Sequence, residues 1–118
     1  MLLSLSLQLI NPVEDSLKSY FQGKYPELCV TQKYHLDEVA FFREQKDGLT
    51  FVGASVGFKG IQPEMYAVIV QTEQKDKIMK QAIDLFEKAI DETELRCFQI
   101  SSISNNNGQD ALVIIWER

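Results

Sequence analysis

The chain has 118 residues, of which 45% are hydrophobic and 25% are charged, and its formal net charge at pH 7 is −5. This length suits one domain, residues 1–118, and the composition is that of a globular protein rather than a disordered one. An acidic surface repels phosphate groups, which excludes nucleic acids and anionic membranes from the predicted partners. Because no apolar run approaches the roughly 20 residues that span a bilayer and no export signal is evident, we predict a cytoplasmic protein.

The first third of the chain is predicted to contain a strand, a helix and a second strand. Leucines alternate with polar residues over 2–10, which is the period-2 pattern of a half-buried strand. Asn11 and Pro12 then match an N-cap followed by proline at the first helical position, which predicts a helix from there to about Gly23. Residues 28–34 form the predicted second strand. The expected buried stripe of the helix consists of Val13, Leu17, Tyr20 and Phe21.

A β-hairpin is predicted in the middle of the chain. Residues 39–46 and 49–58 flank Asp47-Gly48, a two-residue sequence typical of the type I′ turn. With Lys46 opposite Leu49, Phe42 falls opposite Gly53, so that an aromatic ring covers a strand glycine. The expected buried face of this hairpin carries Val39, Phe41, Val52, Ala54 and Val56, together with Arg43.

The second half of the chain is predicted to contain a strand, a helix and a terminal hairpin. The strand covers 65–70, the helix 75–91 and the hairpin 95–103 with 111–116. The apolar runs within the first and last of these strands are unbroken, which is typical of strands covered on both faces. The predicted order is therefore β-α-β-β-β-β-α-β-β. We predict a single α+β domain in which two helices pack on one face of a curved, mostly antiparallel sheet.

The residues that could carry chemistry form no catalytic signature. Residues 53–57 spell Gly-x-Ser-x-Gly, but Ser55 falls within a predicted strand and no histidine follows it. We therefore interpret the match to the nucleophile elbow of hydrolases as coincidental. The single histidine, His35, precedes Asp37 and Glu38 in what we interpret as a polar turn between two strands. One histidine falls short of a zinc site, and we predict no metal and no cofactor.

The two cysteines, Cys29 and Cys97, lie in apolar stretches and lack a Cys-x-x-Cys spacing. We interpret both as buried free thiols that behave as small hydrophobic residues.

The most informative feature is an acidic group on the predicted second helix. Spacings of three and four residues place its carboxylates on one side of the helix. Three carboxylates crowd the C-terminal end, where the helix dipole disfavours negative charge. Because local rules are most often broken at functional sites, we predict a partner-binding surface here, although a solvated face with the neighbouring Lys80 and Lys88 would explain the same pattern. The candidate partner-binding residues are Asp84, Glu87, Asp91, Glu92 and Glu94.

Three hypotheses of function follow. The leading hypothesis is a non-catalytic protein-binding domain that engages a basic partner through its acidic surface. The first alternative is a small-molecule-binding domain or small enzyme with a pocket between sheet and helices. The second is a homodimeric structural module joined through a sheet edge or the second helix. The candidate anchors of the first hypothesis are Tyr20, Tyr25 and Tyr34, and the candidate pocket residues of the second are His35, Asp37, Glu38 and Ser55.

In size, charge and element order, the chain resembles in general character the bacterial immunity proteins that neutralise nuclease toxins. It is similar in the same general way to the dimeric chaperones of secretion systems. Both resemblances imply a protein partner and no catalysis.

Overall fold

The structure is a computed structural model in which helices and strands account for most of the chain. It describes the backbone of residues 2–70 and 75–118, and the side chains from residue 13 on except those of 51 and 71–74. In chain order, the elements are α1 (Leu2–Lys24), β1 (Cys29–Val30), β2 (His35–Lys46), β3 (Leu49–Lys59), β4 (Met65–Val70), α2 (Lys75–Glu92), β5 (Cys97–Ser104) and β6 (Asp110–Glu117).

The N-terminal segment is helical, so the strand predicted over residues 2–10 and the helix start predicted at Asn11 are wrong. Helix α1 runs without a break from Leu2 to Lys24. Leucine is a strong helix former and residues 2–9 contain no β-branched residue, so local propensity favours a helix over the strand that the alternation suggested. Pro12 therefore lies inside the helix, where its missing N–H leaves one carbonyl of the preceding turn without the usual helical donor.

The described strands form a four-stranded sheet and a separate two-stranded ribbon. In the sheet the order is β1-β5-β6-β4, with β1 parallel to β5 and the other neighbours antiparallel. Strands β2 and β3 form the predicted hairpin, and its register is confirmed, with Lys46 opposite Leu49 and Phe42 opposite Gly53. The turn residues Asp47 and Gly48 have φ angles of 54° and 77°, and positive φ at both positions is what a type I′ turn requires.

Two interpretations of the sequence fail between residues 28 and 38. The strand predicted over 28–34 shortens to Cys29–Val30, and the segment interpreted as a polar turn is the first part of β2. The register shifts between Leu36 and Glu38, which marks a bulge at Asp37. A bulge accommodates one extra residue without reversing the chain, so polar residues here occupy a strand instead of a turn.

Cys29 and Cys97 form a disulfide, which corrects the interpretation of both as free buried thiols. The parallel pairing of β1 with β5 sets the two residues opposite each other, with Cα atoms 4.4 Å apart. That distance lies within the range that a disulfide spans. The bond joins segments 68 residues apart in the sequence, so no local pattern could indicate it.

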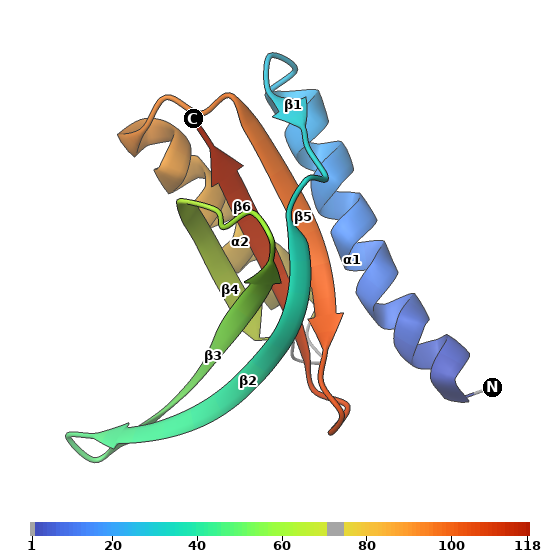
Figure 1. The fold of residues 1–118 in the computed structure, drawn as a ribbon, viewed down its shortest axis with the longest axis vertical. Helices are drawn as coiled ribbons and strands as arrows, with labels where there is room; N and C mark the ends of the chain where they lie inside the picture. The colour runs from blue at the N-terminus through green and yellow to red at the C-terminus, as the bar shows by residue number, and fades with distance from the viewer. Residues whose placement is uncertain (1, 71–74) are drawn as a thin grey trace.

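The elements stack in three layers (Figure 1). Helices α1 and α2 cover one face of the four-stranded sheet, and the β2–β3 ribbon crosses the other face and projects beyond it. Between helices and sheet, the rings of Phe21 and Phe86 stack with centroids 3.8 Å apart. Beneath the ribbon, Val39 and Val56 pack against Val113 of β6. The predicted fold class is therefore confirmed: an α+β domain with two helices on one face of a mostly antiparallel sheet.

Candidate functional site

Strand β4 forms one outer edge of the four-stranded sheet. It pairs with β6 on one side and, among the described residues, no strand pairs with its other side. Its sequence, Met-Tyr-Ala-Val-Ile-Val, contains no charge and no proline. The opposite edge is β1, which is only two residues long. Backbone N–H and C=O groups on a free edge can pair with another chain, and β4 lacks the charges, proline or short length that usually prevent this.

A groove of about 440 Å³ lies between β4 and α2. Its apolar lining includes Tyr66, which is 43% exposed and meets the ring of Phe58 edge-on. A second hollow of about 320 Å³ lies on α2 itself, nearer its N-terminal end, and shares Leu85 with the groove. We call the free edge of β4 and the adjacent flank of α2 the α2–β4 face. Its members are Met65, Tyr66, Ala67, Lys77, Lys80, Gln81, Asp84, Leu85, Lys88, Ala89 and Glu92.

The charges along α2 run against the helix dipole. Lysines dominate the N-terminal half at positions 75, 77 and 80, whereas carboxylates dominate the C-terminal half. Anions are favoured at the N-terminal end of a helix and cations at the C-terminal end, so both halves are mismatched. Asp76 in the first turn is the exception, because a negative charge suits that end of the helix. Towards the C-terminal end, four carboxylates are exposed, and none of them is in an ion pair with any residue that the structure describes. These four are Asp84, Asp91, Glu92 and Glu94, the last of which lies just beyond the end of α2.

Glu87, the fifth acidic residue predicted to bind a partner, faces α1 instead. Its Oε2 lies 2.9 Å from Nζ of Lys24 and accepts a hydrogen bond of 3.3 Å from the hydroxyl of Tyr25. The hydrogen bond from Lys24 lowers the pKa of Glu87, and the same contact raises the pKa of Lys24. This carboxylate therefore joins the two helices, apart from the four exposed ones.

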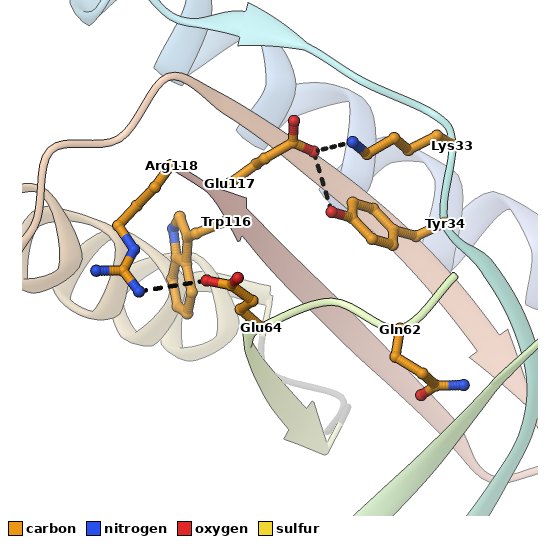
Figure 2. A pocket seen from close by; sticks show the side chains of 7 residues that line it. All are labelled: Lys33, Tyr34, Gln62, Glu64, Trp116, Glu117 and Arg118. Carbon is orange, nitrogen blue, oxygen red and sulfur yellow. Dashed lines mark hydrogen bonds and ion pairs between the residues drawn. The ribbon is translucent and has the colours of Figure 1, made fainter. Parts of the chain in front are cut away.

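A larger groove, of about 590 Å³, lies at the end of β6 (Figure 2). Trp116 and Glu64 line both this groove and the one beside β4, so the two hollows adjoin. The indole N–H of Trp116 is buried and has no hydrogen-bond partner among the described residues. The lining side chains are Lys33, Tyr34, Gln62, Glu64, Trp116, Glu117 and Arg118.

The charged groups of this larger groove pair with one another. Glu117 lies 2.8 Å from Nζ of Lys33 and accepts a hydrogen bond of 3.0 Å from Tyr34, and Arg118 lies 3.2 Å from Glu64 (Figure 2). The hydrogen bond from Lys33 lowers the pKa of Glu117, while burial raises the pKa of Tyr34. Because these charged side chains already pair with one another, none of them is left free to bind a charged ligand in the groove.

The four residues predicted to line a pocket lie along the β2–β3 ribbon. His35, at the start of β2, lines a hollow of about 320 Å³ together with Glu14 of α1 and the 99–101 segment of β5. Asp37, Glu38 and Ser55 are exposed further along the ribbon, outside the lining of that hollow.

The three tyrosines predicted as anchors have different environments. Tyr34 is buried and hydrogen-bonded, so it belongs to the core. Tyr25 contacts Glu87, and Tyr20 is 37% exposed on α1.

Comparison with protein-family models, characterised proteins and solved structures finds no match to this chain. Within the described part of the chain, no three histidine, cysteine or carboxylate side chains gather as a metal site would require. None of its described helices combines the length and the apolar character needed to cross a membrane.

The free edge of β4 is the feature that the sequence analysis missed. The signal was present, because residues 65–70 are apolar without an interrupting charge. That signal predicts a strand covered on both faces, but it does not indicate which strands lie at the edge of the sheet.

Proposed function

We propose that this protein is a non-catalytic protein-binding domain whose α2–β4 face receives a partner with basic side chains. The observation that carries the proposal is the free apolar edge of β4 beside α2, whose unpaired carboxylates include Glu92 in the lining of the groove between them. A strand edge supplies backbone hydrogen bonds, and an adjoining groove accepts alternate side chains of an added segment. Carboxylates beside the groove select positive charge and accelerate association.

The larger groove at the end of β6 supports a small-molecule site less well. Its carboxylates already accept hydrogen bonds from neighbouring cations and from Tyr34. A ligand with charged groups would have to break these contacts before making its own, which costs affinity.

The proposal is tested with an extended peptide of alternating lysine and leucine, about eight residues long so that it spans an ordinary strand. In the variant D91K/E92K/E94K, we expect affinity for this peptide to fall at least about tenfold at low salt, mainly through slower association. The fold should persist and become slightly more stable, because lysine suits a helix C-terminus. Fluorescence anisotropy of the labelled peptide measures the affinity, and thermal melting measures the stability.

The matched control is D15K/E27K/E44K, which produces the same change in net charge at three exposed carboxylates that belong to neither α2 nor β4. At about 0.15 M salt its affinity should stay within about twofold of the wild-type value, since charges more than about 8 Å from the peptide are then largely screened. Equal affinity of the wild-type chain and D91K/E92K/E94K would refute the proposal. So would an equal loss in the control, because net charge alone would then explain the binding.

A further inference from the structure

The charged residues of α2 follow a pattern that is complementary to itself. Lys80, Asp84, Lys88 and Glu92 are spaced by four residues, so their charges alternate along a stripe that turns about 40° around the helix at each step. Residues four apart are neighbours on a helix and could pair within it. No such pair forms, because none of the four is in an ion pair with a described residue.

Antiparallel pairing of two copies of α2 would bring opposite charges together at every position of this series. With the two-fold axis at the level of Phe86, Lys80 of one copy faces Glu92 of the other, and Asp84 faces Lys88. A two-fold axis repeats each contact, so two kinds of pair give four ion pairs. The arrangement also removes the conflict with the helix dipole, because each acidic half meets the basic half of the other helix.

Strand β4 permits the same symmetry. Two copies of an edge strand can pair antiparallel about a two-fold axis perpendicular to the sheet, which passes at the level of a residue because opposite residues share a face. Here the axis lies at Ala67, so that Met65 of one copy is opposite Ile69 of the other. Ala67 and Leu85 line the same groove, so the symmetry centres of β4 and α2 lie at the same level of the molecule. The pairing would place the five apolar residues 65–69 of one copy beside the same five of the other and leave no charge among them.

The spacing of the layers also fits. Helix α2 packs on both β4 and β6, so its axis lies over the boundary between them. Neighbouring strands are about 4.8 Å apart, which places α2 about 5 Å from a two-fold axis at the free edge of β4. Two copies of α2 would then lie about 10 Å apart, close to the 8–10 Å between packed helices.

We propose that the partner of the α2–β4 face is a second copy of this chain, joined by antiparallel pairing of the two β4 strands and of the two α2 helices. This inference rests on the proposed function, because it uses the same face and names the source of the basic side chains as Lys80 and Lys88. The product is a continuous eight-stranded sheet with four helices on one face.

Charge exchange tests the dimer directly. In K80E/K88E the series becomes wholly acidic, and in D84K/E92K it becomes wholly basic. Sedimentation equilibrium at about 100 µM, where a contact of micromolar affinity is nearly saturated, should give the wild-type chain twice the mass of one chain. Each variant alone should have the mass of one chain, because like charges would meet across the axis. An equimolar mixture of the two variants should form a heterodimer, which also shows that both are folded.

The matched control is K46E/K59E, which reverses two exposed lysines of the ribbon and should remain a dimer. A monomeric wild-type chain, a variant that dimerises alone, a mixture that does not associate or a monomeric control would each overturn the inference. A different result would refute the proposed function without bearing on the dimer. If K80E/K88E, which keeps all the carboxylates of α2, does not bind the lysine–leucine peptide, the α2–β4 face is not a receptor for basic segments.

Discussion

Glu117 joins three segments of the chain at the end of β6. Its carboxylate contacts Lys33 and Tyr34 in the segment before β2, and Arg96 lies 3.6 Å away, just before β5. The hydrogen bond from Lys33 lowers the pKa of Glu117 from its ordinary value of 4.5. The folded protein therefore keeps this carboxylate charged at a lower pH than the unfolded chain does. Such a group stabilises the fold above pH 4.5, and the contribution is lost as the pH falls through the folded-state pKa.

Replacement of Glu117 by glutamine should therefore lower stability in a pH-dependent way. At about pH 7, E117Q should lower the free energy of unfolding by about 1 kcal/mol, because it removes charge-assisted hydrogen bonds at a partly buried carboxylate. At about pH 3 the difference should shrink, because the unfolded chain already binds a proton at this carboxylate below its ordinary pKa of 4.5. Urea denaturation at the two pH values measures this. The control is E64Q, at an exposed ion pair, which should cost less than about 0.5 kcal/mol. A loss in E117Q that does not depend on pH would contradict the assignment.

Among the elements, those with strong local patterns could be predicted from the sequence. The Asp47-Gly48 turn fixed the ribbon register, and the helical spacing of apolar residues located α2. The first half of α1 was predicted wrongly because the alternation of leucines over 2–10 has the period of a strand. The high helix propensity of leucine favours the helix that the structure shows. The pairing of β1 with β5, and with it the disulfide, depends on contacts across 68 residues that no local pattern encodes.

The Cys29–Cys97 bond should contribute measurably to stability. A cross-link between residues 68 apart reduces the entropy of the unfolded chain, and the loop-entropy model gives about 4 kcal/mol. We expect reduction to lower the free energy of unfolding by about 2–4 kcal/mol, as measured by urea denaturation with and without a thiol reductant. The C29A/C97A variant should not respond to the reductant. Identical transitions of the oxidised and reduced wild-type chain would contradict the expectation. The cytoplasmic location stays a prediction, and it matters here because disulfides persist mainly in oxidising compartments.

At the scale of the whole molecule, the sequence predicted the class of the fold but not which sheet edge is open. Strands β4 and β6 both read as unbroken apolar runs, yet β6 lies in the middle of the sheet and β4 at its edge. Strand order depends on how all the strands pair, which periodicity along one strand does not encode. The acidic residues of α2 were found from the sequence, whereas the position of β4 at the edge of the sheet, beside α2, became visible only in the structure (Figure 1).

The most direct measurement is amide hydrogen exchange of β4 in K80E/K88E, with and without the lysine–leucine peptide. This variant keeps the carboxylates of α2 and lacks the lysines proposed to bind a second copy, so the face is open to the peptide. Amides on the free edge of β4 have no strand partner among the described residues and should exchange rapidly without the peptide. With the peptide bound, alternate amides of residues 65–70 should exchange at least about tenfold more slowly, while those of the β2–β3 ribbon stay unchanged. Protection confined to the ribbon, or no protection of β4 at a saturating peptide concentration, would contradict the assignment of the α2–β4 face as the binding surface.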